Sequence, residues 1–153
     1  MVKKFIFFIF TITLSISFNA EAKTCKLSIE GNDMMKYNVA SLKVNKDCKK
    51  VALTLKHSGK LAKNIMGHNW VLSTTADMAA VTTASMAAGL AKEYLAKGPK
   101  VLAATKLLGG GQSDTITFDV AKLRAASKKG TKYSYFCTFP GHSAMMKGSL
   151  VFE

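Results

Sequence analysis

The 153-residue sequence is poor in acidic side chains, in histidine and in cysteine. It has 9 aspartates and glutamates against 22 lysines and arginines, 3 histidines, 3 cysteines and a net charge of +13. It lacks an H-E-x-x-H motif, a paired C-x-x-C motif and a glycine-rich phosphate loop, so we do not expect the chemistry of those motifs. The glycine-rich segment LLGGGQ, which begins at Leu107, does not contain the lysine of a phosphate loop, so we predict a turn there.

Arginine is nearly absent: Arg124 is the only one in the sequence. The other basic residues are lysines, which are spread along the chain in runs no longer than a pair. Phosphate forks and base readout favour arginine, so we expect no nucleic-acid partner. The positive charge leaves three other interpretations open: an ordinary lysine-rich surface, an anionic membrane, or an acidic protein partner.

Residues 1–22 form a predicted signal peptide. Two lysines precede an apolar run from Phe5 to Phe18, and Ala20 and Ala22 fit a small-residue cleavage site. The run is too short to span a bilayer as a mature helix, so we expect no membrane insertion after cleavage. Cleavage would leave one domain, residues 23–153. Loss of two lysines and one glutamate would lower the net charge from +13 to +12.

Seven segments alternate between apolar and polar residues, as half-buried β-strands do. Turn signals separate them, and there is no internal repeat. Short strands at this spacing predict an all-β Greek-key sandwich or barrel. The segments are Cys25–Glu30, Ser41–Val44, Lys50–His57, Asn69–Ser73, Asp114–Val120, Lys132–Cys137 and Gly148–Glu153.

One alanine-rich segment, Thr75–Gly98, breaks this alternation. Its larger apolar residues fall roughly at helical spacing. We predict a helix inserted between strands and packed on the outside of the sandwich. Methionine usually fills gaps in cores, so we expect Met78 and Met86 to be packing residues rather than metal ligands.

Three cysteines follow the predicted signal peptide, and an oxidising compartment favours the pairing of two. Cys25 and Cys48 lie near the ends of the first strand-like segments, where a bridge between neighbouring strands can form. Cys137 would then be unpaired. A bare thiol in such a compartment tends to be oxidised, whereas a metal-bound thiolate is protected, so Cys137 indicates a metal site.

Cys137 begins the segment CTFPGHSAMMKG, which holds a thiol, an imidazole and two thioethers within ten residues. The spacing is C-x4-H-x3-M with Met146, or C-x4-H-x2-M with Met145, and the pattern leaves this choice open. These soft donors favour copper over zinc, calcium or magnesium, and two histidines, a cysteine and a distant methionine bind blue copper. A nucleophilic Cys137–His142 pair is disfavoured, because no orienting acid lies nearby in the sequence.

The second imidazole must come from outside this loop, from His68 or His57. His68 follows Gly67, which lets the backbone come close to a metal. His57 ends a strand-like segment, where a partly buried, hydrogen-bonded histidine is the simpler interpretation. We therefore predict His68 as the remaining strong ligand.

Five motifs, GNDMMKYN, KNIMGHNWVLSTTADM, TKLLGGG, DTITFDVAKL and YFCTFPGHSAMMKGSL, together resemble the azurins, small periplasmic blue-copper proteins with the cupredoxin fold. The resemblance covers residues 23–153. It implies an eight-stranded Greek-key β-sandwich with one inserted flap helix, and a location in the periplasm. The sequence departs from the usual pattern at AKGPK and AASKKGTK, which we expect in turns away from the ligands.

The resemblance also implies the role of individual residues around one type 1 copper ion. Met145 becomes a packing residue, and His57 a second histidine that titrates near the site without binding copper. The implied roles are in-plane ligands for His68, Cys137 and His142, a weak axial ligand for Met146, an opposite axial carbonyl for Gly67, a tie between loops for Asn69, a stiffener of the copper loop for Phe139, a buried core indole for Trp70, and a disulfide for Cys25 and Cys48.

The implied function is electron transfer rather than catalysis. The protein would cycle copper between Cu(I) and Cu(II) and carry electrons between redox proteins such as c-type cytochromes and periplasmic oxidoreductases. The alternative is a periplasmic protein for copper storage or delivery. We expect a monomer that meets an acidic partner through an apolar patch, steered by Lys60, Lys63 and Lys147. The patch comprises Met35, Leu61, Ile65, Met66, Met86, Phe139, Gly141 and Ala144.

Overall fold

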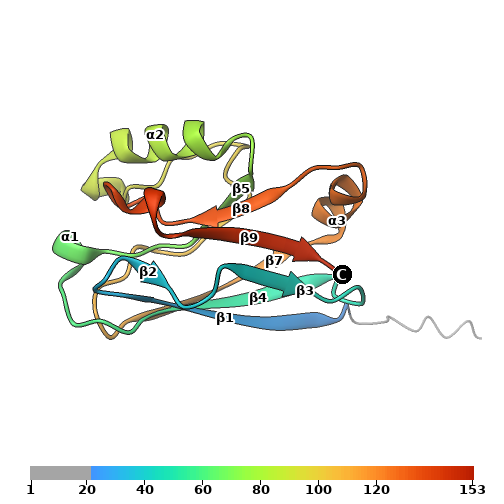
Figure 1. The fold of residues 1–153 in the computed structure, drawn as a ribbon, viewed down its shortest axis with the longest axis horizontal. Helices are drawn as coiled ribbons and strands as arrows, with labels where there is room; N and C mark the ends of the chain where they lie inside the picture. Colours follow the sequence, from blue (N-terminus) through green and yellow to red (C-terminus); the bar gives the residue numbers. More distant parts are fainter. Residues whose placement is uncertain (1–21) are drawn as a thin grey trace, which may run out of the picture.

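Two β-sheets packed face to face form the body of the computed structural model, which describes residues 22–153 (Figure 1). The predicted signal peptide lies outside the described residues, apart from Ala22. One sheet has the order β2-β1-β4-β7, formed by β2 (Lys36–Tyr37), β1 (Thr24–Asn32), β4 (Lys50–His57) and β7 (Ser113–Asp119). The other has the order β3-β9-β8-β5-β6, formed by β3 (Ser41–Val44), β9 (Lys147–Phe152), β8 (Tyr133–Phe136), β5 (Val71–Thr74) and β6 (Ala103–Ala104).

The alternating pattern of the sequence becomes the inner face of each sheet. In β4, Val51, Leu53 and Leu55 are fully buried, and Leu53 lies opposite Leu27 of β1 and Ile116 of β7. Each such buried aliphatic side chain stabilises the fold by about 1.5–3 kcal/mol. The all-β cupredoxin-like sandwich is therefore confirmed. Its seven longer strands overlap the seven predicted segments with ends shifted by up to two residues, and the described residues form nine strands rather than the eight expected.

The inserted helix is confirmed as α2 (Met78–Ala88), which covers the five-stranded sheet (Figure 1). It is shorter than predicted, because Gly89 adopts a positive φ of 72° and a short 3-10 turn, η1 (Leu90–Lys92), follows. Met78 packs on the cluster of Val71, Val81 and Phe136, as expected. The packing role predicted for Met86 is wrong, because this side chain is 40% exposed.

Three further helical segments interrupt the strands: α1 (Lys63–Met66), α3 (Ala121–Lys128) and the 3-10 turn η2 (His142–Ala144). The prediction of a turn at AASKKGTK, residues 125–132, is wrong for its first half, because residues 125–128 belong to α3. The carboxylate of Asp119, the last residue of β7, accepts a hydrogen bond at 2.8 Å from the N–H of Ala121, the first residue of this helix. The eight residues of α3 show no clear helical periodicity in the sequence, since they follow β7 almost directly.

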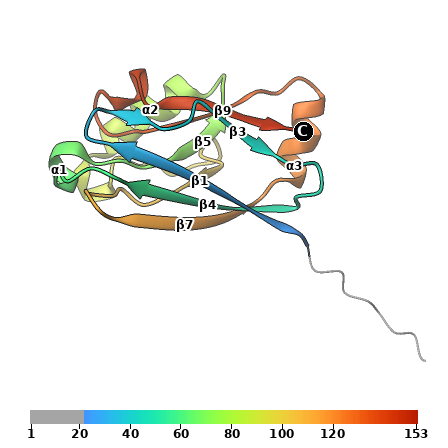
Figure 2. The same ribbon diagram turned by 60° about the horizontal axis from the view of Figure 1, so that its bottom comes forward.

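The two ends of the sandwich differ in what they hold. At one end, the Cys25–Cys48 disulfide is confirmed and links β1 to the loop before β4. Helix α3 lies at this end and α1 at the other, in both views of the ribbon (Figures 1 and 2).

Within residues 22–153, no helix has the length and hydropathy needed to cross a bilayer.

Candidate metal centre

The site is built where β5 and β8 lie side by side. These strands pair antiparallel, with Val71 opposite Phe136. His68 and Asn69 come just before β5, and Cys137 comes just after β8. The pairing therefore brings together two loops that are about 70 positions apart in the sequence.

Three predicted ligands meet at this point. One ligand atom from each of His68, Cys137 and His142 lies within 4.8 Å of the other two, and all three side chains are buried. The Nδ1 atom of His142 is 3.6 Å from the sulfur of Cys137. Cys137 is also a free cysteine, as the sequence predicted.

The ring of His68 has one nitrogen left for a metal. Its Nε2 lies 2.8 Å from the carbonyl oxygen of Asn32, which can only accept, so Nε2 carries the proton. Its Nδ1 then bears a lone pair, and this buried atom has no hydrogen-bond partner among the described residues. An orphaned buried acceptor costs about 1–3 kcal/mol, so its lone pair fits a metal ligand.

The protonation states agree with this arrangement. Burial lowers the pKa of His68 and of His142 to about 4, so both imidazoles are neutral near pH 7. Burial also raises the pKa of the Cys137 thiol to about 12, although the backbone N–H groups of Asn69 and Phe139 donate to its sulfur. A metal that replaces the thiol proton would find those two donors already in place.

The weaker contacts expected from Gly67 and Met146 are placed nearby. The carbonyl oxygen of Gly67 lies 3.8 Å from the Cys137 sulfur. Met146 is fully buried. A Cβ atom added to Gly31 would lie 2.9 Å from the His68 ring and 3.1 Å from the Met146 methyl, so ring and methyl border the same point. Gly31 therefore lets β1 approach the site closely.

Met145 points elsewhere. The sequence interpretation made it a packing residue, but its side chain is 58% exposed. It directly follows the short turn η2 as its C-terminal cap, and from there the chain directs Met145 to the surface and Met146 to the interior. That packing role is therefore wrong, and of the two methionines only Met146 turns inward toward the site.

Asn69 ties the two loops together through Thr138. Its Oδ1 accepts from the Thr138 N–H, and its Nδ2 donates to the Thr138 hydroxyl, both at 2.8 Å. The hydroxyl in turn donates to the carbonyl oxygen of Tyr94, which follows η1. The tie was expected, but its extension to Tyr94 was not. Its only trace in the sequence is a polar threonine beside the cysteine.

Phe139 lies between the flap segment and the site. Its ring centroid is 4.6 Å from that of His142 and 5.3 Å from that of Tyr94. Tyr94 and its neighbour Glu93 both adopt positive φ angles, 48° and 55°, which non-glycine residues seldom do. The insert therefore contacts the Cys137–His142 loop through a turn whose residues adopt a left-handed conformation.

His57 is adjacent to the site but is not available to a metal. Its ring stacks on His68 with centroids 4.2 Å apart. Its Nδ1 accepts from the Gly59 N–H at 3.1 Å, so its Nε2 donates to the Met66 carbonyl oxygen at 2.8 Å. Both nitrogens are used, which agrees with the choice of His68 as the ligand.

The predicted apolar patch lies at the same end of the molecule. Leu61, Ile65 and Met86 are 40%, 59% and 40% exposed, and Met35, Met66 and Phe139 are partly exposed. Gly141 and Ala144 are exposed. The sequence interpretation missed three exposed side chains from neighbouring segments: Met34, Leu90 and Met145. The charge of Lys63 is offset by Glu93 at 3.1 Å.

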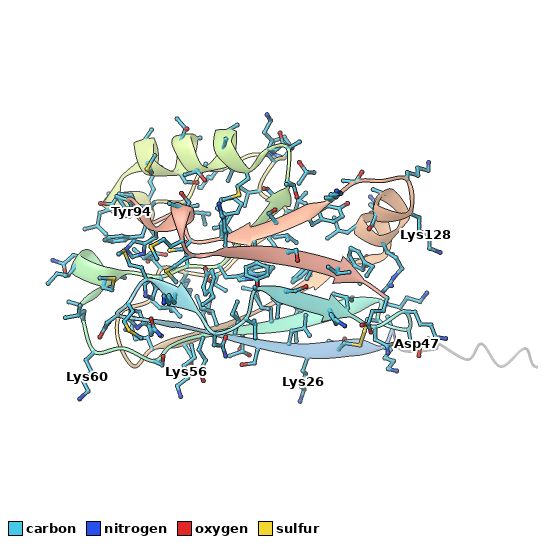
Figure 3. All side chains as sticks on the ribbon, in the orientation of Figure 1. Lys26, Asp47, Lys56, Lys60, Tyr94 and Lys128 are labelled. Atoms are coloured by element: carbon cyan, nitrogen blue, oxygen red, sulfur yellow. A yellow bond between two sulfur atoms is a disulfide. The ribbon has the colours of Figure 1, made fainter. Side chains whose placement is uncertain are left out.

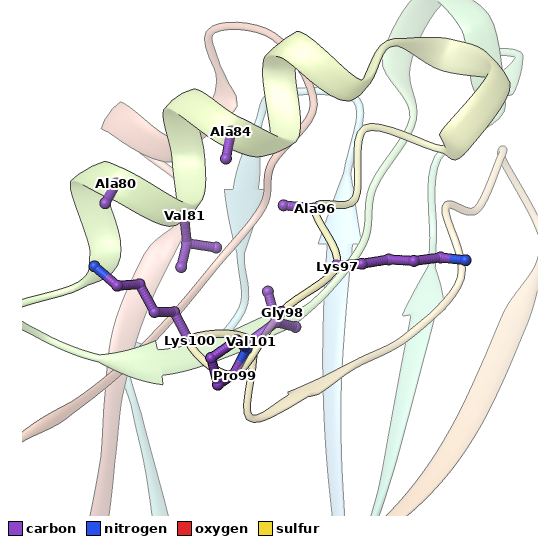
Figure 4. A pocket seen from close by; sticks show the side chains of 9 residues that line it. All are labelled: Ala80, Val81, Ala84, Ala96, Lys97, Gly98, Pro99, Lys100 and Val101. Carbon is purple, nitrogen blue, oxygen red and sulfur yellow. The ribbon is translucent and has the colours of Figure 1, made fainter.

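A separate cavity of about 170 Å³ lies under α2 (Figure 4). Val81 points into it from the helix, and Lys97 points away from it. Lys100, on its rim, is paired with Asp77 at 2.9 Å. Its lining residues include no histidine, cysteine or carboxylate, so it is not a metal site.

Comparison with known proteins agrees with the geometry. Residues 23–153 match the model of the copper-binding proteins of the plastocyanin/azurin family. The chain is 52% identical over 133 residues to the azurin of Pseudomonas aeruginosa strain PAO1, covering 86% of this chain and 87% of that protein. It is 53% identical over 130 residues to the azurin of Bordetella pertussis strain Tohama I, covering 84% of each. The chain therefore belongs to the plastocyanin/azurin family of copper-binding proteins.

Proposed function

We propose that this protein is a periplasmic one-electron carrier whose type 1 copper is held by His68, Cys137 and His142. Met146 and the carbonyl of Gly67 supply weaker contacts. The observation that carries the proposal is the buried cluster itself, in which a free thiol and two imidazoles bring ligand atoms within 4.8 Å of one another and one imidazole has an orphaned nitrogen. Copper supplies one-electron chemistry by alternating between Cu(I) and Cu(II).

The residues around the cluster suit a carrier because they are fixed before any metal binds. The His68 ring is held by the Asn32 carbonyl on one side and by the stacked His57 ring on its face. The loop of Cys137 is held by Asn69 through Thr138. Fixed ligands need little rearrangement, and the two N–H groups on the sulfur tune the potential.

We propose that electrons enter and leave through the apolar patch, where Phe139 packs on His142. Apolar patches on small proteins mark interaction sites, and redox encounters are small and transient. Lys60 and Lys147 flank the patch. Their ammonium groups have no carboxylate within 4.0 Å among the described residues, so they would attract an acidic partner such as a c-type cytochrome. The association rate with that partner should fall as ionic strength rises, and a rate independent of salt would contradict this.

Absorption spectroscopy of the copper-loaded protein tests the site. We expect an intense thiolate-to-copper band toward the red end of the visible spectrum, which Cys137→Ser abolishes. Met146→Leu should retain copper but change the reduction potential. The matched control is Met78→Leu, in the cluster under α2, which should leave band and potential unchanged. A wild-type protein without the band would overturn the proposal.

A role in copper storage or delivery fits less well, because carriers that release copper need exposed, exchangeable ligands. Here His68 and Cys137 are completely buried and His142 is 3% exposed. We expect a competing chelator to remove copper slowly, at a rate far below the rate at which the protein exchanges electrons with a redox partner. Cell fractionation tests the location: the mature protein should be found in the periplasm with Lys23 at its N-terminus.

A further inference from the structure

Basic side chains are concentrated at the end of the molecule opposite the candidate metal centre. Two segments meet there: residues 45–49, between β3 and β4, and residues 120–132, which include α3. Figure 3 shows Asp47 and Lys128 at this end and Lys60 and Tyr94 at the other. The two segments together carry one acidic residue, Asp47, and the basic residues Lys46, Lys49, Lys122, Arg124, Lys128, Lys129 and Lys132.

A cavity of about 220 Å³ opens between these segments. Its cationic lining consists of Lys46, Lys49, Arg124 and Lys128, and no carboxylate is among its lining residues. The rest of the lining is apolar and includes the buried disulfide residue Cys48. The cavity therefore combines an apolar part with four positive charges.

Arg124 fixes the walls of this cavity. Its guanidinium donates to the backbone carbonyl of Asn45 at 2.6 Å and to that of Glu153 at 3.0 Å, and it lies over the Phe152 ring. The Val120 N–H also donates to the Lys49 carbonyl at 3.0 Å. The two segments are thus held at a set separation.

The lysines of the cavity are free of counter-charges. The carboxylates at this end are committed elsewhere: Asp47 pairs with Lys23, Glu153 pairs with Lys43, and Asp119 accepts the Ala121 N–H at the start of α3. Among the described residues, no carboxylate lies within 4.0 Å of the ammonium groups of Lys46, Lys49 or Lys128. Like charges around one cavity repel each other, and a bound anion would relieve that repulsion.

We propose that this cavity binds the phosphate group of an anionic phospholipid at a membrane surface. Free phosphate shares the chemistry, but the seven basic side chains at this end of the molecule match a surface of many phosphate groups better than a single ion. The Lys49 N–H donates to the Lys23 carbonyl at 2.9 Å, so the N-terminus expected at Lys23 after cleavage lies beside the cavity and adds a positive charge there. Binding there leaves the metal centre and its patch at the far end, facing away from the membrane.

Vesicle cosedimentation of the copper-loaded protein tests the proposal. The vesicles contain equal parts of phosphatidylglycerol and phosphatidylcholine, with pure phosphatidylcholine as the neutral comparison. The wild-type protein should bind only the anionic vesicles. The triple variant Lys46→Gln, Lys49→Gln, Lys128→Gln should bind them roughly 100-fold more weakly, from the loss of three lysines near the surface.

A matched variant separates a site from overall charge. Lys26→Gln, Lys97→Gln, Lys106→Gln removes the same charge from lysines outside the cavity, and should weaken vesicle binding by less than about fivefold. Equal weakening by the two triple variants, or no binding to anionic vesicles, would overturn the proposal. Intact absorption of the copper band in both variants verifies that they fold.

Two further probes distinguish other ligands. Inorganic phosphate should displace the wild-type protein from vesicles better than chloride at equal ionic strength. Saturation of the cavity by phosphate without any vesicle binding would overturn the assignment to lipid. Slower electron exchange of the cavity variant with an acidic cytochrome, with unchanged vesicle binding, would also overturn it, because the cavity would then serve a protein partner.

Discussion

Replacement of Asn69 by alanine tests whether the two ligand loops are held together by one buried amide. Asn69 and Thr138 are both fully buried. The substitution removes the acceptor of the Thr138 N–H and the donor to the Thr138 hydroxyl, each at 2.8 Å. The hydroxyl keeps its own bond to the Tyr94 carbonyl, so the N–H is the group left without a partner.

The expected loss of stability follows from these contacts. An unpaired buried N–H costs about 1–3 kcal/mol, and the lost bond to the hydroxyl adds about 0.5–1.5 kcal/mol. We therefore expect the copper-free Asn69→Ala variant to lose about 1.5–4.5 kcal/mol of unfolding free energy. The backbone N–H of Asn69 still donates to the Cys137 sulfur, so copper should bind, with an altered potential.

Urea denaturation of the copper-free protein measures this loss. Asn38→Ala is the matched control, because the Asn38 side chain also accepts a backbone N–H, from Glu30 at 2.9 Å, but is exposed. Water replaces that acceptor, so the control should lose less than about 1 kcal/mol. If both variants lose the same amount, or Asn69→Ala loses less than about 1 kcal/mol, the reasoning about the tie is refuted.

Three further predictions concern the ligands. Gly31→Ala places a methyl against the His68 ring and the Met146 side chain, so it should lower the free energy of unfolding by about 1–3 kcal/mol and shift the copper absorption band. Denaturation and absorption spectroscopy check the two effects, and the absence of both would contradict the prediction. In the copper-free protein, the lowered pKa values of His68 and His142, about 4, mean that the unfolded chain takes up protons first as the pH falls. The free energy of unfolding should therefore be highest above about pH 6.5 and fall toward pH 4, by up to about 3 kcal/mol for each imidazole. Unfolding curves that do not change between these pH values would contradict the burial argument. Because the Cys137 thiol, with a pKa raised to about 12, is protonated at pH 7 while both imidazoles are neutral, binding of Cu(II) should release one proton, measured by pH-stat titration; release of none or of two would be inconsistent with these states.

The sequence predicts the sandwich well because period-2 alternation reports directly on a half-buried sheet. It does not predict β2 and β6, since two-residue pairings carry no periodicity. It also does not predict α3, where eight residues follow a strand and only Asp119 signals a helix start. The extent of α2 was overestimated, because alanine favours a helix beyond Gly89, where the positive φ ends it.

Prediction of the site is strongest for residues whose chemistry is unusual in this chain. An unpaired cysteine, a nearby histidine and a soft thioether indicate copper from residue types alone. The direction of a side chain is different, because it depends on the local backbone. Met145 and Met146 are adjacent and chemically identical, and only the turn η2 sends one outward and the other inward.

The register of β5 against β8 links the apolar core to the metal centre. Val71 faces Phe136 across the ladder, so continuation of the same pairing places Asn69 beside Thr138, where their side chains bond. The chain at the start of β5 is buried on both faces, with Leu72 and the preceding Trp70 in the main core and Val71 in the cluster under α2. A slip of one residue would exchange these faces and press an indole into the space that holds a valine. The core therefore enforces the one register that brings His68 to Cys137, and the flap helix contributes to ligand placement although it supplies no ligand.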